Sequence, residues 1–106
     1  MGRWRRMGIA VALYLAAVCL EPDMKNLSAG VTTRDGQVYS DDSLEVFLDT
    51  RQDRTTYFQF VFNALGAYFD ACRGADGQLD TGWNARATVA ARRLDDRWLL
   101  EAAIPF

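Results

Sequence analysis

Two glutamates, Glu45 and Glu101, stand inside apolar segments, and a pair of carboxylates is what hydrolysis of a glycosidic bond requires. One carboxyl group would protonate the leaving oxygen, and the other would act as base or nucleophile. Each glutamate also fits the partly solvated face of a sheet. No nucleophile elbow, phosphate-binding glycine loop or metal-ligand motif occurs elsewhere in the sequence. We therefore expect a protein without catalytic residues, in which the glutamates bind a ligand or line a sheet surface.

Aspartates are frequent in the polar segments and offer the oxygen ligands that calcium prefers. Their spacing does not match an EF-hand loop. Aspartates in turns usually accept hydrogen bonds from backbone amides, so this capping role is favoured. No cofactor is expected, and a structural calcium ion stays an open alternative. The residues concerned are Asp41, Asp42, Asp49, Asp53, Asp70, Asp76 and Asp80.

Aromatic residues near polar ones suggest a third kind of site, for carbohydrate. A flat ring can stack on the apolar C–H face of a sugar, while planar polar side chains bond the hydroxyls. The aromatic candidates near polar loops or strand edges are Tyr39, Tyr57, Tyr68 and Trp83, and Tyr39, just ahead of an acidic pair, is the preferred stacking residue. Gln59 and Asn63 share one strand face, although an ordinary outward polar face explains that pattern too. Trp83 suits a lid over the core and a ligand platform equally well, whereas Trp98 begins an alternating strand and is expected in the core.

The composition excludes several classes of function. The chain of 106 residues has no histidine, which removes the commonest general base, metal ligand and axial haem ligand. The formal net charge is −2 and the basic residues are scattered, apart from the first six residues and the pair Arg92 and Arg93. No nucleic-acid surface is predicted. Cys19 and Cys72 match no zinc pattern, and two buried thiols are favoured over one disulfide.

Two central segments alternate apolar and polar residues with a period of two, which indicates strands. They cover residues 43–49 and 56–63. Three aliphatic residues share one face of the first segment, and three phenylalanines share one face of the second, so both faces should contact a core. The opposite faces contain Glu45 and Phe47 in the first segment, and Tyr57, Gln59, Val61 and Asn63 in the second.

The last third of the chain predicts a hairpin. Residues 85–94 are mostly small, Asp95 and Asp96 mark a tight turn, and residues 98–104 alternate again. A helix over residues 85–93 fits the propensities but not the short turn into a clear strand. Between the two regions we expect a bend at 64–66, a strand at 67–71 and a loop at 73–82. Several short strands in a chain of this length indicate one antiparallel β-sandwich domain.

The first twenty residues permit two interpretations. A basic start followed by an apolar run over residues 7–20 imitates a secretory signal. The run is too short for a membrane span, which needs about 20 apolar residues, so no span is expected in this chain. The turn that follows, Glu21-Pro22-Asp23, would equally well end a buried strand over residues 10–19. Composition alone supports both interpretations equally.

Five pieces of the sequence form a recognisable set. They are Ala-Leu-Tyr-Leu at 12–15, Tyr-Ser-Asp-Asp-Ser-Leu-Glu-Val-Phe-Leu-Asp at 39–49, Tyr-Phe-Gln-Phe-Val-Phe-Asn at 57–63, Gly66, and Trp-Leu-Leu-Glu-Ala-Ala-Ile-Pro-Phe at 98–106. Together they resemble the carbohydrate-binding module family 9 type of domain over nearly the whole chain. The resemblance implies a β-sandwich related to the DOMON group, and it favours a strand over residues 10–19. It also implies a carbohydrate partner, an oligo- or polysaccharide.

The resemblance extends to three site positions. In sugar-binding members, an aromatic residue ahead of the acidic strand stacks on the ligand, and this position is Tyr39 here. The positions of Glu45 and Asn63 bond sugar hydroxyls in those members. A sugar-binding arginine of the family falls at Val61, so one polar contact is lost. Further family strands would precede residue 1 and follow residue 106, and we therefore expect a fragment of a larger protein.

The expected function is non-catalytic carbohydrate binding through Tyr39, Glu45 and Asn63, with Gln59 and Trp83 as further candidates. Family members accompany secreted glycan-degrading enzymes or stand at the front of bacterial envelope proteins. The resemblance therefore implies an extracellular or envelope location and fusion to other domains. The alternative is a structural or interaction module with a degenerate sugar site at the front of a larger envelope protein.

Overall fold

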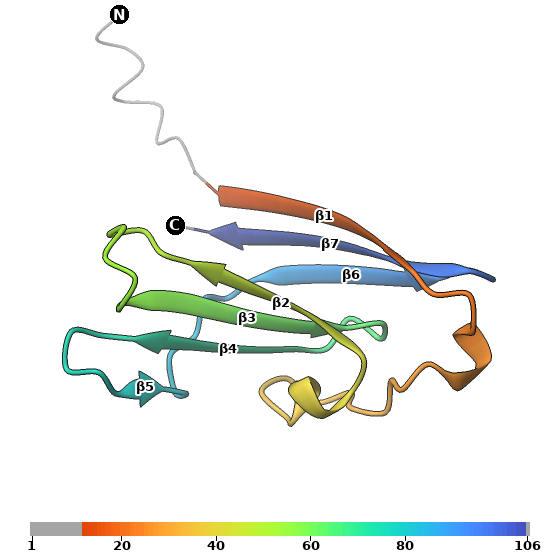
Figure 1. Cartoon of the computed structure of the whole chain (residues 1–106), viewed down its shortest axis with the longest axis horizontal. Helices are drawn as coiled ribbons and strands as arrows, with labels where there is room; N and C mark the ends of the chain where they lie inside the picture. Colours follow the sequence, from red (N-terminus) through yellow and green to blue (C-terminus); the bar gives the residue numbers. More distant parts are fainter. Residues whose placement is uncertain (1–11, 106) are drawn as a thin grey trace, which may run out of the picture.

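Within residues 12–105, which the computed structural model describes, seven strands form two antiparallel sheets packed as a sandwich (Figure 1). The three-stranded sheet has the order β1-β7-β6, formed by β1 (Ala12–Leu20), β7 (Arg97–Pro105) and β6 (Thr88–Arg93). The four-stranded sheet has the order β2-β3-β4-β5, formed by β2 (Ser43–Leu48), β3 (Tyr57–Asn63), β4 (Tyr68–Arg73) and β5 (Leu79–Asp80). Two short 3₁₀ helices, η2 (Met24–Asn26) and η3 (Val38–Ser40), lie between β1 and β2. The predicted antiparallel β-sandwich is confirmed.

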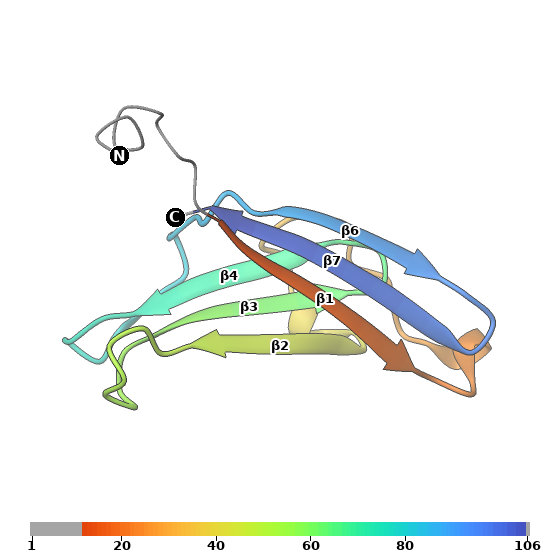
Figure 2. The ribbon, with the colours of Figure 1, turned by 90° about the horizontal axis from the view of Figure 1, so that it is seen from above.

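The core lies between the sheets, where alternate residues of each strand meet. Phe60 and Phe62 of β3 are fully buried, and they face Trp98, Leu100 and Ile104 of β7 across the sandwich. Figure 2 shows the three-stranded sheet above the four-stranded one, with its strands crossing at an oblique angle, as twisted sheets pack. Burying several large apolar side chains in one place is the main stabilising contribution to this fold. The predicted core faces of β3 and β7, with Trp98 included, are confirmed.

The turns follow from local chemistry. Gly66 in the β3–β4 turn has φ 82°, a left-handed conformation that glycine adopts without steric cost. The β6–β7 hairpin closes over the predicted Asp95-Asp96 turn, where the amide of Leu94 donates to the carbonyl of Arg97 at 2.8 Å. The segment 85–93 contains β6, so the helical alternative does not apply.

Two predictions need correction or completion. Residues 73–82 were expected to be loop throughout, but Leu79 and Asp80 pair with Arg73 and Cys72 as the short strand β5. Two residues are too few to show a strand period. The apolar run near the N-terminus forms β1 from Ala12 onward, which confirms the strand, and the basic start of the predicted signal lies outside the described residues.

The segment 28–42 crosses the outer face of the four-stranded sheet, the face turned away from the other sheet. Val38 of η3 is fully buried there against Val61 of β3 and Ala67, with Val31 and Phe69 packed around them. Figure 2 shows η3 behind the four-stranded sheet, on the side opposite the three-stranded one. This second, smaller core covers one end of the outer face and leaves the other end open.

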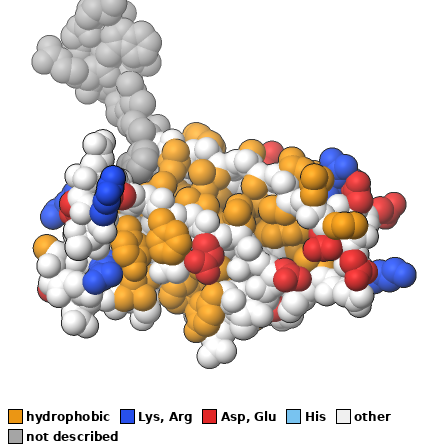
Figure 3. Space-filling model, viewed as in Figure 1, with side chains coloured by type: hydrophobic (Ala, Val, Ile, Leu, Met, Phe, Trp, Pro, Cys, Tyr) orange, Lys and Arg blue, Asp and Glu red, His pale blue; other side chains and the backbone are white. Residues whose placement is uncertain are grey.

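The surface is uneven in character. In the space-filling view, hydrophobic side chains lie exposed over much of the visible face, and acidic groups gather near the β1–η2 connection and the β6–β7 turn, on the right (Figure 3). Cys19 and Cys72 are free thiols, as favoured over a disulfide, but each is half-buried rather than fully buried. In the part of the chain described, no helix has the length and apolar character to cross a membrane.

Candidate functional site

The candidate site is the outer face of the four-stranded sheet. Strand register places its residues in rows across β2, β3 and β4. The first row is Glu45, Val61 and Phe69; the second is Phe47, Gln59 and Ala71; the third is Tyr57 and Arg73. Because neighbouring strands lie about 4.8 Å apart and rows recur about every 7 Å, these side chains line one surface some 10 Å by 15 Å.

Tyr39 lies at one edge of this surface. It belongs to η3, and its side chain is 52% exposed. Its ring meets the ring of Phe69 edge-on, with centroids 5.6 Å apart and an interplanar angle of 86°. Tyr39 therefore stands next to the first row, and Glu45 occupies the far end of that row. An exposed aromatic ring and a carboxylate lie about two strand spacings apart, roughly 10 Å.

Glu45 and Gln59 have side chains that are free for a ligand. Glu45 is exposed and Gln59 is half-buried. Within residues 12–105, neither side chain is engaged in a hydrogen bond or ion pair. A carboxylate accepts hydrogen bonds and an amide both donates and accepts, so together they match the hydroxyls of a sugar.

Asn63 is on the same face but is used internally. It is fully buried. Its Nδ2 donates to the carbonyl of Val31 at 2.7 Å and to Asp41 at 3.0 Å, and its Oδ1 accepts from the amides of Leu65 at 3.1 Å and Ala67 at 3.0 Å. These four bonds use both donors and both acceptor sites of the amide. The structure thus makes Asn63 a positioning residue for the segment that presents Tyr39.

Asp41 completes that anchorage. Its carboxylate accepts hydrogen bonds from the amides of Gly30 at 3.0 Å and Val31 at 2.9 Å, from Asn63, and from the hydroxyl of Ser28 at 3.3 Å. These donors, with the Val31 amide first, lower the pKa of Asp41 below its ordinary value of 3.8. Asp41 therefore stays charged at neutral pH and fixes the backbone two residues after Tyr39.

A second aromatic pair lies further along the same surface. Phe47 is 53% exposed, and its ring meets that of Tyr57 at 5.3 Å with an interplanar angle of 76°. Phe47 is not among the residues that the sequence suggests for a site, whereas Tyr57 is one of the four aromatic candidates. The available signal was the alternation of β2 and β3, which places Phe47 beside Glu45 and Tyr57 beside Gln59 on the outward face.

Residues 2–106 of the chain match the family model described as carbohydrate family 9 binding domain-like. The protein belongs to this family. No curated protein and no solved structure matches the chain. On the outer face of this family 9-like domain, an exposed tyrosine and a carboxylate without a partner among the described residues lie on one surface.

In this family 9-like domain Trp83 lies on the inner side of the four-stranded sheet, away from the other candidate residues. Its ring packs at 4.9 Å from that of Phe58 and 5.9 Å from that of Phe60, both on the inner face of β3. It also lines an apolar hollow of about 450 Å³ between the sheets, together with Leu48 and Ile104. Of the two roles expected for Trp83, its position matches the lid over the core.

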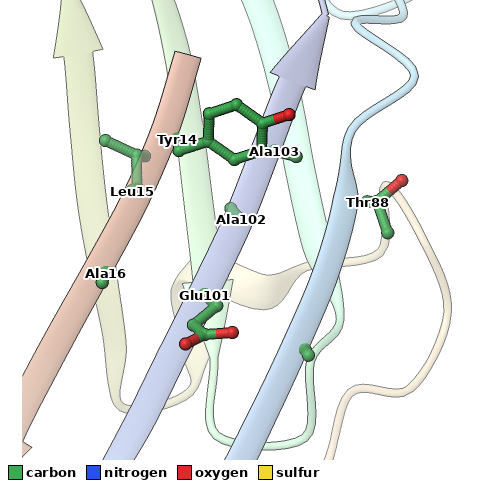
Figure 4. Close-up of a pocket in the computed structure, with 8 residues that line it drawn as sticks. Tyr14, Leu15, Ala16, Thr88, Glu101, Ala102 and Ala103 are labelled. Atoms are coloured by element: carbon green, nitrogen blue, oxygen red, sulfur yellow. The ribbon is translucent and has the colours of Figure 1, made fainter. Parts of the chain in front are cut away.

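The two glutamates that suggested glycoside hydrolysis lie on opposite sides of the family 9-like sandwich. Glu101 is exposed on the outer face of the three-stranded sheet, in a shallow groove of about 420 Å³ between Tyr14 and Thr88 (Figure 4). Glu45 is on the outer face of the other sheet. With the whole sandwich between them, they cannot flank one bond, as a hydrolytic pair must.

Most of the aspartates in the polar segments cap backbone amides, as the sequence suggested, but Asp70 is buried on β4 and forms an ion pair with Arg34. Asp49 and Asp53 accept backbone amides in the β2–β3 connection, and Asp76 and Asp80 do so around β5. Three backbone and side-chain bonds from Thr55 and Thr56 lower the pKa of Asp53 to about 2. Among the described residues, no three carboxylates or thiols are placed to hold a metal ion.

Proposed function

We propose that this domain binds carbohydrate, without catalysing a reaction, on the outer face of its four-stranded sheet. The observation that supports this best is the first row of that face, where the exposed ring of Tyr39 and the unengaged carboxylate of Glu45 lie at the two ends of a row whose middle residue, Val61, is buried under Val38. An aromatic ring for stacking and a carboxylate for hydrogen bonding therefore lie on one surface, in a family described as carbohydrate-binding.

In this proposal each residue has one task. Tyr39 stacks on the C–H face of a sugar ring, and Glu45 and Gln59 bond its hydroxyls. Asn63 and Asp41 act one step away, because they hold the segment that presents Tyr39. One stacked ring and two or three hydrogen bonds support a weak complex, with a Kd on the order of a millimolar, about 4 kcal/mol.

The wider setting is also proposed. The domain would serve as a binding module of a secreted or envelope protein of a bacterium, fused to other domains and contributing to polysaccharide breakdown. The resemblance to the family 9 type of domain supports this setting. Reading the gene around the coding region tests it, since an adjoining glycosidase is expected and an adjoining membrane barrel would favour the structural alternative described below.

Calorimetric titration of the chain with soluble glucose- and xylose-type oligosaccharides tests the binding itself. We expect weak heats of binding that disappear in Tyr39→Ala. Tyr14→Ala is the matched control, because Tyr14 is a tyrosine 77% exposed on the other sheet's outer face. Heats that Tyr39→Ala leaves unchanged, or no heat with any sugar while the protein is folded, would contradict the proposal.

One observation favours a second function, a structural module with a degenerate sugar site. The family's sugar-binding arginine is replaced by Val61, which is fully buried under Val38, and Asn63 has no free hydrogen-bonding capacity. In that case the outer face would contact protein rather than sugar. The same titration discriminates, because a folded domain without any heat of sugar binding supports the structural role.

A further inference from the structure

The far end of the outer face combines aromatic rings with an arginine. In the third row Tyr57 faces Arg73 across β3 and β4, and Phe47 packs against Tyr57 from β2. Gln59 stands one row nearer to Glu45. This set, which we call the distal subsite (Phe47, Tyr57, Gln59 and Arg73), lies two to four residues along the strands from the row of Glu45, about 7 to 13 Å.

A small hollow adjoins the distal subsite. It measures about 150 Å³ and lies where the β2–β3 connection meets the β4–β5 turn. That is below the about 300 Å³ or more of sites for drug-sized ligands, so it suits one sugar unit or one substituent. Arg51, Tyr57 and Arg73 line it, and no acidic residue is among its lining residues.

The guanidinium of Arg73 has an unused donor. Its Nε is buried and has no hydrogen-bond partner among residues 12–105, where it is the one side-chain atom of this kind. Native proteins rarely leave a buried donor unpaired, because desolvation of the group is then uncompensated. The acidic side chains of the adjoining turn do not fill the gap, since Asp76 bonds the amide of Gln78 and Asp80 bonds that of Gly82.

Arg51 and Arg73 also lack an ion-pair partner in the described part of the chain, where only Arg34 and Arg97 form salt bridges. Both guanidinium groups supply cationic donors beside the hollow, and the nearby carboxylates, those of Asp53 next to Arg51 and of Asp76 and Asp80 near Cys72, form an ion pair with neither in the described part of the chain. Guanidinium binds carboxylate and similar planar anions through paired hydrogen bonds. The aromatic pair next to it offers a stacking surface for the ring that would hold such an anion.

We propose that the distal subsite binds an acidic sugar unit, so that the preferred ligand is a glycan with uronic acid residues rather than a neutral one. The sugar ring stacks on Phe47 and Tyr57, and its carboxylate meets Arg73, with Arg51 adding charge from the β2–β3 connection. This inference rests on the proposed carbohydrate binding by the same face and specifies its ligand class. It also makes the ligand longer than one sugar, since Tyr39 and the distal subsite are separated along the strands.

The test compares matched ligands by calorimetric titration of the intact chain. The probes are a xylo-oligosaccharide, the same oligosaccharide with one glucuronic acid branch, free glucuronate and inorganic sulfate. We expect the acidic oligosaccharide to bind about tenfold more tightly than the neutral one, as one charge-assisted contact predicts. This advantage should shrink at high salt, which screens the charges. Free glucuronate and sulfate should bind far more weakly than the acidic oligosaccharide.

Two variants and a control locate the effect. Arg73→Gln should abolish the tenfold preference for the acidic oligosaccharide, and Arg51→Gln should reduce this preference in part. Arg92→Gln removes an exposed charge from the other sheet and should change neither. Circular dichroism verifies that each variant is folded, and Arg51→Gln, at an exposed position, provides the test should Arg73→Gln unfold.

The outcomes separate this inference from the proposed function. Equal affinities for neutral and acidic oligosaccharides, both lost in Tyr39→Ala, would overturn the acidic preference and leave carbohydrate binding in place. Sulfate or free glucuronate binding as tightly as the acidic oligosaccharide would reveal a simple anion site and overturn the inference as well. Absence of binding by every oligosaccharide would overturn both proposals.

Discussion

At the scale of single residues, Glu45 and Asn63 share one sheet face but differ in what a ligand can reach. The resemblance to the family 9 type of domain implies that both positions form hydrogen bonds with sugar hydroxyls. The structure leaves the carboxylate of Glu45 exposed and unengaged, whereas Asn63 is buried and makes four internal hydrogen bonds. The alternation of a strand predicts the face on which a residue lies. It does not predict whether the side chain forms hydrogen bonds with a segment distant in sequence, as Asn63 does with Val31.

Substitution of Asn63 should therefore lower the stability of the fold, whereas substitution of Glu45 should lower the affinity for sugar. Asn63→Ala leaves buried backbone groups of Val31 and Ala67 unpaired and should cost about 3 kcal/mol of stability in urea denaturation. Glu45→Gln should change stability by less than about 0.5 kcal/mol and weaken sugar affinity about tenfold. If Asn63→Ala kept full stability and lost only sugar binding, Asn63 would be a direct sugar ligand and the positioning role would be wrong.

Asp53 predicts a dependence of stability on pH. Its pKa is lowered to about 2 in the fold by bonds from Thr55 and Thr56, against an ordinary value of 3.8. A lowered pKa means that the folded state binds the proton less well than the unfolded chain, so this contribution is full above about pH 4 and is lost as the pH falls to about 2. Asp53 is fully exposed, and the effect should be shallow. Urea denaturation between pH 2 and 6 should show a smaller loss in Asp53→Asn; an identical slope would contradict this role.

At the scale of elements, an ion pair between partly exposed Arg34 and buried Asp70 helps to hold the segment 28–42 on the sheet, in addition to the bonds of Asn63 and Asp41. The guanidinium of Arg34 donates from Nη2 to both carboxylate oxygens of Asp70 at 2.8 Å, and it lies 4.6 Å over the ring of Tyr68. Asp70 is fully buried on β4, and burial raises its pKa, while the amide of Ala85 and Arg34 counteract that rise. This pair holds the segment that presents Tyr39.

Removing Arg34 should loosen that segment. Arg34→Met leaves a buried carboxylate without its cation and should cost about 3 kcal/mol, the lower end for buried pairs because Arg34 is 35% exposed. Acid should relieve the loss, since the raised pKa of Asp70 lets it take up a proton in the folded state as the pH falls. Denaturation at pH 7 and pH 4 measures this, with Arg34→Met/Asp70→Asn as the control that removes the charge. An Arg34→Met loss equal at both pH values would contradict the account.

The strands and this segment differ in how far a sequence predicts them. β2, β3 and β7 show a two-residue period, and their core faces follow directly from it. β5 has two residues and shows no period. The cover over the outer face depends on Val38 meeting Val61 and on Arg34 meeting Asp70, 36 positions away. Such contacts join residues that are far apart in the sequence, and the alternation within a single segment does not predict them.

At the scale of the whole molecule, the sandwich presents two outer faces of different character. On the three-stranded sheet, Tyr14, Val18 and Leu20 of β1 are exposed along with Glu101. On the four-stranded sheet, aromatic rings alternate with Glu45, Gln59 and Arg73, and the segment 28–42 shapes one end. We propose carbohydrate binding on the second face only, so the face of the three-stranded sheet serves as the control.

An NMR titration of the ¹⁵N-labelled chain with xylo-oligosaccharide tests this assignment most directly. We expect the amide chemical shifts of β2, β3 and η3 to change around Glu45, Gln59 and Tyr39. The amide shifts of β1 and β7 around Tyr14 and Glu101 should not change. Shift changes centred on the three-stranded sheet, or none on either sheet at millimolar sugar, would contradict this assignment.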